Sequence, residues 1–252
     1  MVIKIYYYFL YSLIKKMSLM KCQICDLQMV PHVYPLHVKA CGEYTLYSQL
    51  GQDLIVADFY KEKKEGFFVE IGAVDGIEIS NTYLLETKYN WKGICVEAIP
   101  NKFEKLVKNR PNSKCVSKAV FRESGLKVPF SICHSLELVS GMNDYLGGNW
   151  KSTVESNRTV IDVETMTLNE ILDENEAPLF IDYLSLDTEG TELEILKSVD
   201  LNKYTFGIID VEHNYLEEER KNIREFLTSN GYAFKIDNMW DDQYIHNSLL
   251  SG

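Results

Sequence analysis

Four ionisable residues follow two apolar runs of the sequence, at the places where buried strands would end. They come directly after residues 180–186 and 206–211, and they are Asp187, Glu189, Glu212 and His213. Because neighbouring parallel strands end at the same edge of a sheet, we expect these side chains to lie within reach of one another. Such a cluster could take the proton from an alcohol, or hold a divalent cation that lowers the pKa of that alcohol.

A second candidate site is the turn at residues 69–76, VEIGAVDG, where another apolar run ends. Gly72 and Gly76 allow the backbone to turn sharply and to approach a ligand closely. Glu70 and Asp75 flank the turn, and their charges disfavour a phosphate ligand. The sequence has neither G-x-G-x-x-G nor G-K-[ST]. The expected ligand is therefore neutral or cationic, and S-adenosylmethionine fits because its sulfonium is positive and its ammonium group binds carboxylates.

Glu97 extends this candidate ligand site. It ends the next short apolar run, residues 93–97, and it lies 21 residues after Gly76. An acidic side chain in this position is placed to accept hydrogen bonds from both hydroxyl groups of a ribose. The alternative is a solvated carboxylate at a strand end.

The elements that would position these residues alternate along the chain. Apolar runs bounded by turn residues predict strands buried on both faces, at 67–71, 93–97, 114–121, 180–186 and 206–211. The spacing of apolar residues predicts helices around them, at 48–60, 81–88, 100–109, 191–199 and 215–229. This alternation predicts one open α/β sheet, mostly parallel, with helices on both faces.

Three further segments complete the predicted fold. Residues 124–159 contain several glycines and are expected to form short strands and a long loop. Thr167 and Glu170 have the spacing of a capping box at the start of a short helix. Residues 232–237 and 244–249 are expected to close the sheet as a hairpin.

The composition supports one folded domain with an N-terminal appendage. The chain has 252 residues, 46% of them hydrophobic, which is enough apolar material for one large core. It carries 26 Lys and Arg against 37 Asp and Glu, a formal net charge of -11. This negative charge disfavours binding to nucleic acid and to anionic membranes.

The first residues raise the question of a membrane segment. Residues 3–14 are almost all aromatic or aliphatic, but they are too few to span a bilayer, which takes about 20 apolar residues. A signal peptide or signal anchor in residues 1–16 is the alternative, and Met17 or Met20 could be the true start. Without a secretory signal, we expect a cytoplasmic protein.

The six cysteines indicate a reducing compartment. Cys95, Cys115 and Cys133 fall in apolar runs and are expected to be buried free thiols. One group near the N-terminus superficially matches a zinc-ligand set: Cys22, Cys25, His32, His37 and Cys41. Its spacing is irregular and the segment carries no basic surface, so a structural zinc site is only an alternative.

Five segments together resemble one known family. They are SQLGQD (48–53), FFVEIGAVDGIEISNTYLLE (67–86), WKGICVEAIP (91–100), LSLDTEGTELEILKS (184–198) and DVEHN (210–214). In this order and at this spacing, they resemble the FkbM family of S-adenosylmethionine-dependent methyltransferases. The resemblance covers residues 44–249, so we expect an N-terminal extension of residues 1–43 and a methyltransferase domain of residues 44–252.

This resemblance implies a fold and a reaction. The fold is the class I methyltransferase sheet, which has seven strands and an antiparallel last strand. The reaction is O-methylation of a hydroxyl group on a sugar, a glycan or a small metabolite, with S-adenosylmethionine as the cofactor.

The resemblance also implies roles for individual residues. The methionine part of the cofactor would meet Glu70, Gly72 and Asp75. The ribose would meet Glu97, and the adenine edge would meet Ala98 and Ile99. Further cofactor contacts are implied for Gln49, Asp53, Ala73 and Asn81. In catalysis, Asp187 would face the transferred methyl group, His213 would be the favoured general base, and Glu189 would assist.

Two alternatives stay open at this point. In the first, Mg²⁺ or Mn²⁺ is the main activator, held by Asp187, Glu189, Glu212 and His213. In the second, the chain is an inert methyltransferase-fold module that recognises a glycan or a protein partner. The sequence specifies neither the acceptor nor the oligomeric state, and a homodimer is compatible with it.

Overall fold

A computed structural model describes residues 20–21, 28–29, 31, 33, 35–37, 47–134, 139–146 and 151–250. The predictions for residues 1–16 lie outside these residues, as do four members of the alternative zinc set, Cys22, Cys25, His32 and Cys41. The fifth member, His37, is buried. The boundary between residues 43 and 44 stays a prediction.

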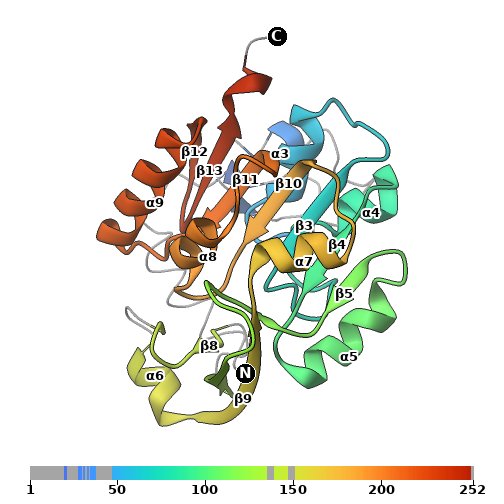
Figure 1. The fold of residues 1–252 in the computed structure, drawn as a ribbon. Helices are drawn as coiled ribbons and strands as arrows, with labels where there is room; N and C mark the ends of the chain where they lie inside the picture. The colour runs from blue at the N-terminus through green and yellow to red at the C-terminus, as the bar shows by residue number, and fades with distance from the viewer. Residues whose placement is uncertain are drawn as a thin grey trace.

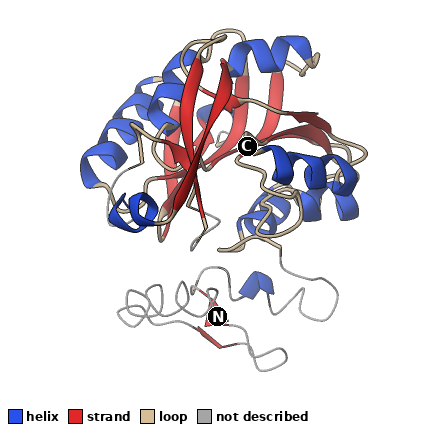
Figure 2. Cartoon of the chain, turned by 90° about the horizontal axis from the view of Figure 1, so that it is seen from below, coloured by secondary structure: helices blue, strands red, loops and turns tan. Residues whose placement is uncertain are grey.

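The main sheet has seven strands and runs through the centre of the molecule (Figures 1 and 2). In spatial order they are β12 (Tyr232–Asn238), β13 (Asp241–His246), β11 (Thr205–Glu212), β10 (Phe180–Leu186), β3 (Phe67–Ile71), β4 (Lys92–Val96) and β5 (Lys114–Val116). The five strands from β11 to β5 are parallel, and β13 pairs with β11 in the antiparallel sense. The predicted class I methyltransferase sheet is therefore confirmed.

Helices cover both faces of this sheet, as Figure 2 shows. Phe68 and Tyr183 pack on one side, with α3 (Gln52–Phe59), α4 (Tyr83–Tyr89) and α5 (Pro100–Asn109). Their strand neighbours Val69 and Leu184 pack on the other side, with α7 (Leu168–Glu174), α8 (Glu192–Ser198) and α9 (Glu217–Ser229). Successive side chains of a strand point to opposite faces. Burial on both faces therefore explains why these strands are unbroken apolar runs.

A second, smaller sheet lies beyond one end of the main sheet (Figure 1). Its order is β6 (Ala119–Val120), β9 (Arg158–Met166), β7 (Lys127–Cys133) and β8 (Gly141–Met142), and α6 (Lys151–Ser156) precedes β9. The predicted short strands are thus present, but β7 and β9 are longer and pair in the antiparallel sense over seven residues each. A two-strand pair, β1 (Met20–Lys21) with β2 (Gln28–Met29), is separate from both sheets.

The prediction of a single strand over residues 114–121 is wrong. The segment forms β5 at the edge of the main sheet and then β6, which pairs with β9. Ala119 and Phe121 pack with Phe130 and Val163 of the second sheet rather than with the main core. One apolar run therefore serves two separate cores.

The closing hairpin is confirmed, but its second strand begins at Asp241 rather than at residue 244. The missed residues, Asp241 to Gln243, are polar and still buried. Each has a partner: Gln52 donates to Asp241, Arg220 to Asp242, and Gln243 itself donates to Asp210.

No helix among the described residues combines the length and the apolar character needed to cross a membrane.

We expect Leu184→Ala to lower the free energy of unfolding by about 2 to 5 kcal/mol, because it leaves a cavity at a fully buried position of β10. Leu179→Ala, at a side chain that is 63% exposed, is the matched control and should change it by less than about 0.5 kcal/mol. Urea denaturation of the two variants measures the difference. Equal losses would contradict the assignment of Leu184 to the core.

Candidate active site

The register of the parallel strands brings the predicted site residues to one edge of the sheet. Leu186 lies beside Ile71 and Val211, and Ile71 lies beside Val96. Each of these apolar residues ends its buried run. The next residue in each strand is therefore at the same level, and these residues are Gly72, Glu97, Asp187 and Glu212.

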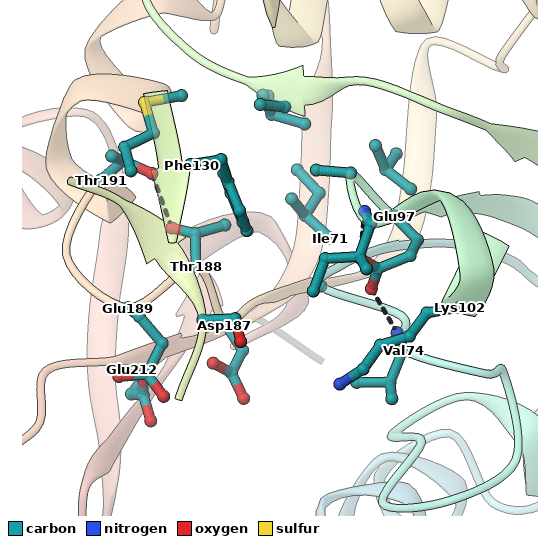
Figure 3. Close-up of a pocket in the computed structure, with 18 of the residues that line it drawn as sticks. Ile71, Val74, Glu97, Lys102, Phe130, Asp187, Thr188, Glu189, Thr191 and Glu212 are labelled. Carbon is teal, nitrogen blue, oxygen red and sulfur yellow. Dashed lines mark hydrogen bonds between the residues drawn. The ribbon is translucent and has the colours of Figure 1, made fainter. Parts of the chain in front are cut away.

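An open cleft of about 770 Å³ lies at this edge. The loops after β3, β4 and β10 line its floor, and Phe130, Ser140 and Met142 of the second sheet and its loop line the opposite wall. Figure 3 shows two separate polar ends. Asp187, Glu189 and Glu212 group at one end, and Glu97 lies with Val74 and Lys102 at the other.

Gly72 allows the β3 loop to lie against the end of β10. Its φ is 86°, and a Cβ at this position would meet the carbonyl oxygen of Asp187 at 2.0 Å. No other residue type fits such an approach. The amides of Gly72 and Ala73 both donate to the carbonyl oxygen of Val96, at 3.1 and 3.0 Å. The loop is thus fixed between β4 and β10.

Glu97 holds the other side of the same loop. Its carboxylate accepts from the amide of Val74 at 2.9 Å and from the amide of Ile99 at 2.7 Å. Burial raises its pKa to about 6 despite these two hydrogen bonds. A carboxylate has about four lone-pair sites, so Glu97 can still accept hydrogen bonds from a ribose. Ala98 and Ile99 line the cleft beside it.

Glu70, by contrast, is buried behind the loop and does not line the cleft. It accepts from the hydroxyls of Ser80 and Thr82 and forms an ion pair with Arg110 at 3.3 Å. Arg110 is fully buried, pairs with Glu86 at 2.6 Å and donates to the carbonyl oxygen of Gly76. This buried network supports the loop from beneath.

The residues implied as cofactor contacts fall into two groups, those that line the cleft and those that do not. Gln49, Gly72, Glu97, Ala98 and Asp187 line the cleft, whereas five others do not: Asp53, Glu70, Ala73, Asp75 and Asn81. The carboxylate of Asp75 accepts from the amides of Ile77 and Glu78, and Asn81 donates to Ser185. These contacts stabilise the loop and the start of α4. A direct cofactor contact by the second group stays a prediction.

Asp187, Glu189 and Glu212, which we call the carboxylate trio, come together as the sequence predicts. One carboxylate oxygen of each lies within 4.8 Å of the others. Asn214 orients Glu189 by donating to its Oε2 at 3.0 Å. Burial and the charge of Glu192 raise the pKa of Asp187 to about 7. Burial and the neighbouring carboxylates also raise the pKa values of Glu189 and Glu212.

His213 does not join the trio, although it follows Glu212 directly. It is buried, its Nδ1 accepts from the amide of Tyr215, and its Nε2 lies 3.7 Å from a carboxylate oxygen of Asp242. Burial and the charge of Arg220 lower its pKa. The structure therefore brings together three of the four predicted residues, and His213 lies on the side of α9.

Several cleft residues were not predicted from the sequence. Thr188 and Thr191 lie within the motif that contains Asp187. Each stands between two acidic residues of the motif, which could have indicated that they also line the site. Phe130, Ser140 and Met142 reach the cleft through the fold of the second sheet. No periodicity in the sequence indicates that contact. Lys102 and Lys118 add two cations to the lining.

Comparison with known families decides the assignment that this geometry leaves open. Residues 70–234 match the family described as the methyltransferase FkbM domain, and this range begins near the end of β3 and includes β4, β10 and β11 with the loops that follow the four strands. The chain belongs to the FkbM methyltransferase family. It is accordingly an S-adenosylmethionine-dependent methyltransferase by family, with the β3 loop and the carboxylate trio inside the matched range.

Two solved structures that are similar to this FkbM-family chain are distant from it in sequence. One is precorrin-6y C5,15-methyltransferase from Geobacter metallireducens GS-15, with 12% identity, 80% of this chain and 90% of that chain covered, and a TM-score of 0.44. Another is a methyltransferase from Pyrococcus furiosus, with 14% identity, 85% and 94% covered, and a TM-score of 0.41. A search of curated proteins found no match.

Asp53 provides a test of the electrostatics around the site. Its fully buried carboxylate accepts from Ser48 at 2.5 Å and from the amide of Leu54, but its Oδ2 has no hydrogen-bond partner within the described part of the chain. Burial raises its pKa from 3.8 to about 6. The folded state therefore binds more protons than the unfolded state between these pH values, and stability falls as pH rises through them.

We expect Asp53→Asn to remove about 2 to 3 kcal/mol of the loss in unfolding free energy that accompanies a rise from about pH 4 to about pH 7. Asp58→Asn, at an exposed position of the same helix, should leave the pH dependence unchanged. Urea denaturation across this pH range measures both. An unaltered slope in Asp53→Asn would show that this carboxyl group titrates alike in both states.

Proposed function

We propose that this FkbM-family methyltransferase methylates a hydroxyl group of a sugar, a glycan or a small metabolite. The observation that carries the proposal is the position of Asp187. It lies half-buried at the end of β10, lines the cleft and has a pKa of about 7. A carboxylate with such a pKa is suited to take a proton from an alcohol near neutral pH.

The Glu97 end of the cleft fits the nucleoside part of the cofactor. Glu97 offers lone pairs to ribose hydroxyls, while Val96, Ala98 and Ile99 supply an apolar edge for a flat base. Gly72 lies between this end and Asp187, and without a side chain it lets the β3 loop pack directly against the end of β10. Bound S-adenosylmethionine supplies an electrophilic methyl group on a sulfonium centre.

The trio end of the cleft fits a hydroxyl-bearing acceptor. The carboxylates accept hydrogen bonds from hydroxyl groups, and Thr188 and Thr191 can both donate and accept. Phe130 and Met142 offer an apolar surface opposite these polar groups. In this arrangement Asp187 takes the proton of the acceptor hydroxyl, Glu189 and Glu212 orient the acceptor, and the second sheet excludes water.

The inert binding module is the second candidate. Such a module would differ from the enzyme in not binding the cofactor, because a glycan or protein partner would contact only the surface of the protein. Isothermal titration calorimetry with S-adenosylhomocysteine separates the two. Saturable binding with one site per chain supports the enzyme, and no heat of binding at millimolar ligand supports the inert module.

We expect Asp187→Asn to lower the rate of methyl transfer by about 10²- to 10⁴-fold, because the acceptor loses its general base. The affinity of the same variant for S-adenosylhomocysteine, measured by calorimetry, separates the loss of a base from the loss of a cofactor contact. His213→Gln should retain most activity, because His213 does not line the cleft. Transfer of radioactive methyl groups measures both variants. Near-normal rates in Asp187→Asn, together with a large loss in His213→Gln, would mean that His213 and not Asp187 is the general base.

We expect Glu97→Gln to weaken S-adenosylhomocysteine binding about tenfold or more, because hydrogen bonds to a charged acceptor are lost. Glu104→Gln, at an exposed position of α5, is the control of equal charge and should bind normally. Calorimetry gives the affinities, and a melting curve confirms that each variant is folded. Equal affinities in Glu97→Gln and the control would place the ribose elsewhere.

A further inference from the structure

We propose that the carboxylate trio binds a divalent cation of the oxygen-preferring class, such as Mg²⁺ or Mn²⁺. The site would use one carboxylate from the end of β10, one from the end of β11 and one from the loop between them: Asp187, Glu212 and Glu189. The cation would lie beside the place proposed above for the acceptor hydroxyl, not in it. The role in methyl transfer rests on the proposed function, whereas the binding itself does not.

The spacing of the trio suits a single ion. Its oxygens lie within 4.8 Å of one another. Oxygens that bind one cation at 2.0 to 2.6 Å are separated by at most about 4 to 5 Å. The three side chains point toward a common space in Figure 3. Small side-chain rotations are therefore enough to bring one oxygen from each onto a shared ion.

Glu212 supplies an observation independent of this spacing. The residue is only 7% exposed, and its Oε2 has no hydrogen-bond partner among the described residues. A buried carboxylate oxygen without a donor is costly, because it has lost water and gained nothing in return. A cation between Glu212 and the other two carboxylates would satisfy this oxygen.

No basic side chain neutralises the trio within the part of the chain that the structure describes. The ion pairs there use other carboxylates, such as Asp182, Glu194 and Asp242. The nearby carboxylates of Glu192 and Asp241 are also buried and add to the negative potential. Within the described residues, the three carboxylates therefore face one another with no positive side chain to balance their charge.

The ligand set also indicates the class of ion. Three carboxylate oxygens suit hard cations and leave further coordination positions for water and for an acceptor hydroxyl. Asn214 already fixes one oxygen of Glu189, in the manner of the outer partners that orient metal ligands. A hydroxyl bound to such a cation ionises more readily, and its proton passes to a trio oxygen that is not on the ion.

The test is direct titration of the full chain, freed of metal by a chelator, with MnCl2 and MgCl2. Calorimetry and the electron paramagnetic resonance of Mn²⁺ should show one ion per chain. Glu212→Gln and Glu189→Gln keep the side-chain shape, remove one charge each and should weaken Mn²⁺ binding about tenfold or more. Glu194→Gln on α8 removes the same charge outside the cleft and should bind Mn²⁺ normally.

Thermal unfolding gives a second measurement that a purely structural role would not reproduce. Mn²⁺ should raise the Tm of the parent and of Glu194→Gln, and at the same Mn²⁺ concentration it should raise the Tm of Glu212→Gln less. Without metal, Glu212→Gln should melt no lower than the parent, because it removes repulsion. The proposal is overturned if the parent binds no Mn²⁺ at millimolar concentration, or if both trio variants bind it as tightly as the parent.

The outcome for the cation is separable from the outcome for the proposed function. If methyl transfer to a hydroxyl acceptor proceeds in a protein that binds no Mn²⁺, the cation site fails and the proposed function stands. If one Mn²⁺ binds through the trio but no hydroxyl acceptor is methylated, the cation site stands and the proposed function fails.

Discussion

Electrostatic repulsion among carboxylates at one edge of the sheet is the constraint on which the site depends. Five acidic residues gather near the ends of β10 and β11: Asp187, Glu189, Glu192, Glu212 and Asp241. Two of them accept hydrogen bonds from neutral donors within the fold. Glu192 accepts from Thr188 and Gly190, and Asp241 accepts from Gln52. The other three are left facing the cleft, where a proton, a hydroxyl group or a cation must compensate them.

The opposite end of the cleft depends on a rigid loop. Gly72 brings the β3 loop against Asp187, and Glu97 holds its other side through Val74. Beneath it, Arg110 pairs with Glu70 and Glu86 in a fully buried network. Removing one partner of such a network leaves a buried charge uncompensated. The network therefore serves to fix the distance between the nucleoside end and the trio end, which is what alignment of two reactants requires.

The sequence predicts the main sheet well because its strands are buried on both faces. The apolar runs 67–71 and 180–186 coincide with β3 and β10, since each residue of such a strand contacts helices on one side or the other. Residues 114–121 and the start of β13 were misplaced for the opposite reason. The structure of each segment depends on residues far away in the sequence. Residues 119–121 pack against the second sheet, and the buried polar residues Asp241 and Asp242 are paired with Gln52 and Arg220.

The site was predictable in its strand ends but not in its side-chain directions. Parallel strands ending together placed Gly72, Glu97, Asp187 and Glu212 at one edge, as the motifs indicate. Spacing alone could not show that His213 turns toward Asp242, or that Glu70 is occupied by Arg110. Both outcomes depend on tertiary contacts with α9 and α5. The cleft wall formed by Phe130 and Met142 depends on the second sheet, whose strands carry no motif.

The most direct test is a crystal structure of the chain grown with S-adenosylhomocysteine and MnCl2, with data collected at the manganese absorption edge. The account predicts a ribose against Glu97 and one anomalous peak between Asp187, Glu189 and Glu212. A nucleoside bound away from Glu97, with no anomalous peak at the trio, would contradict it.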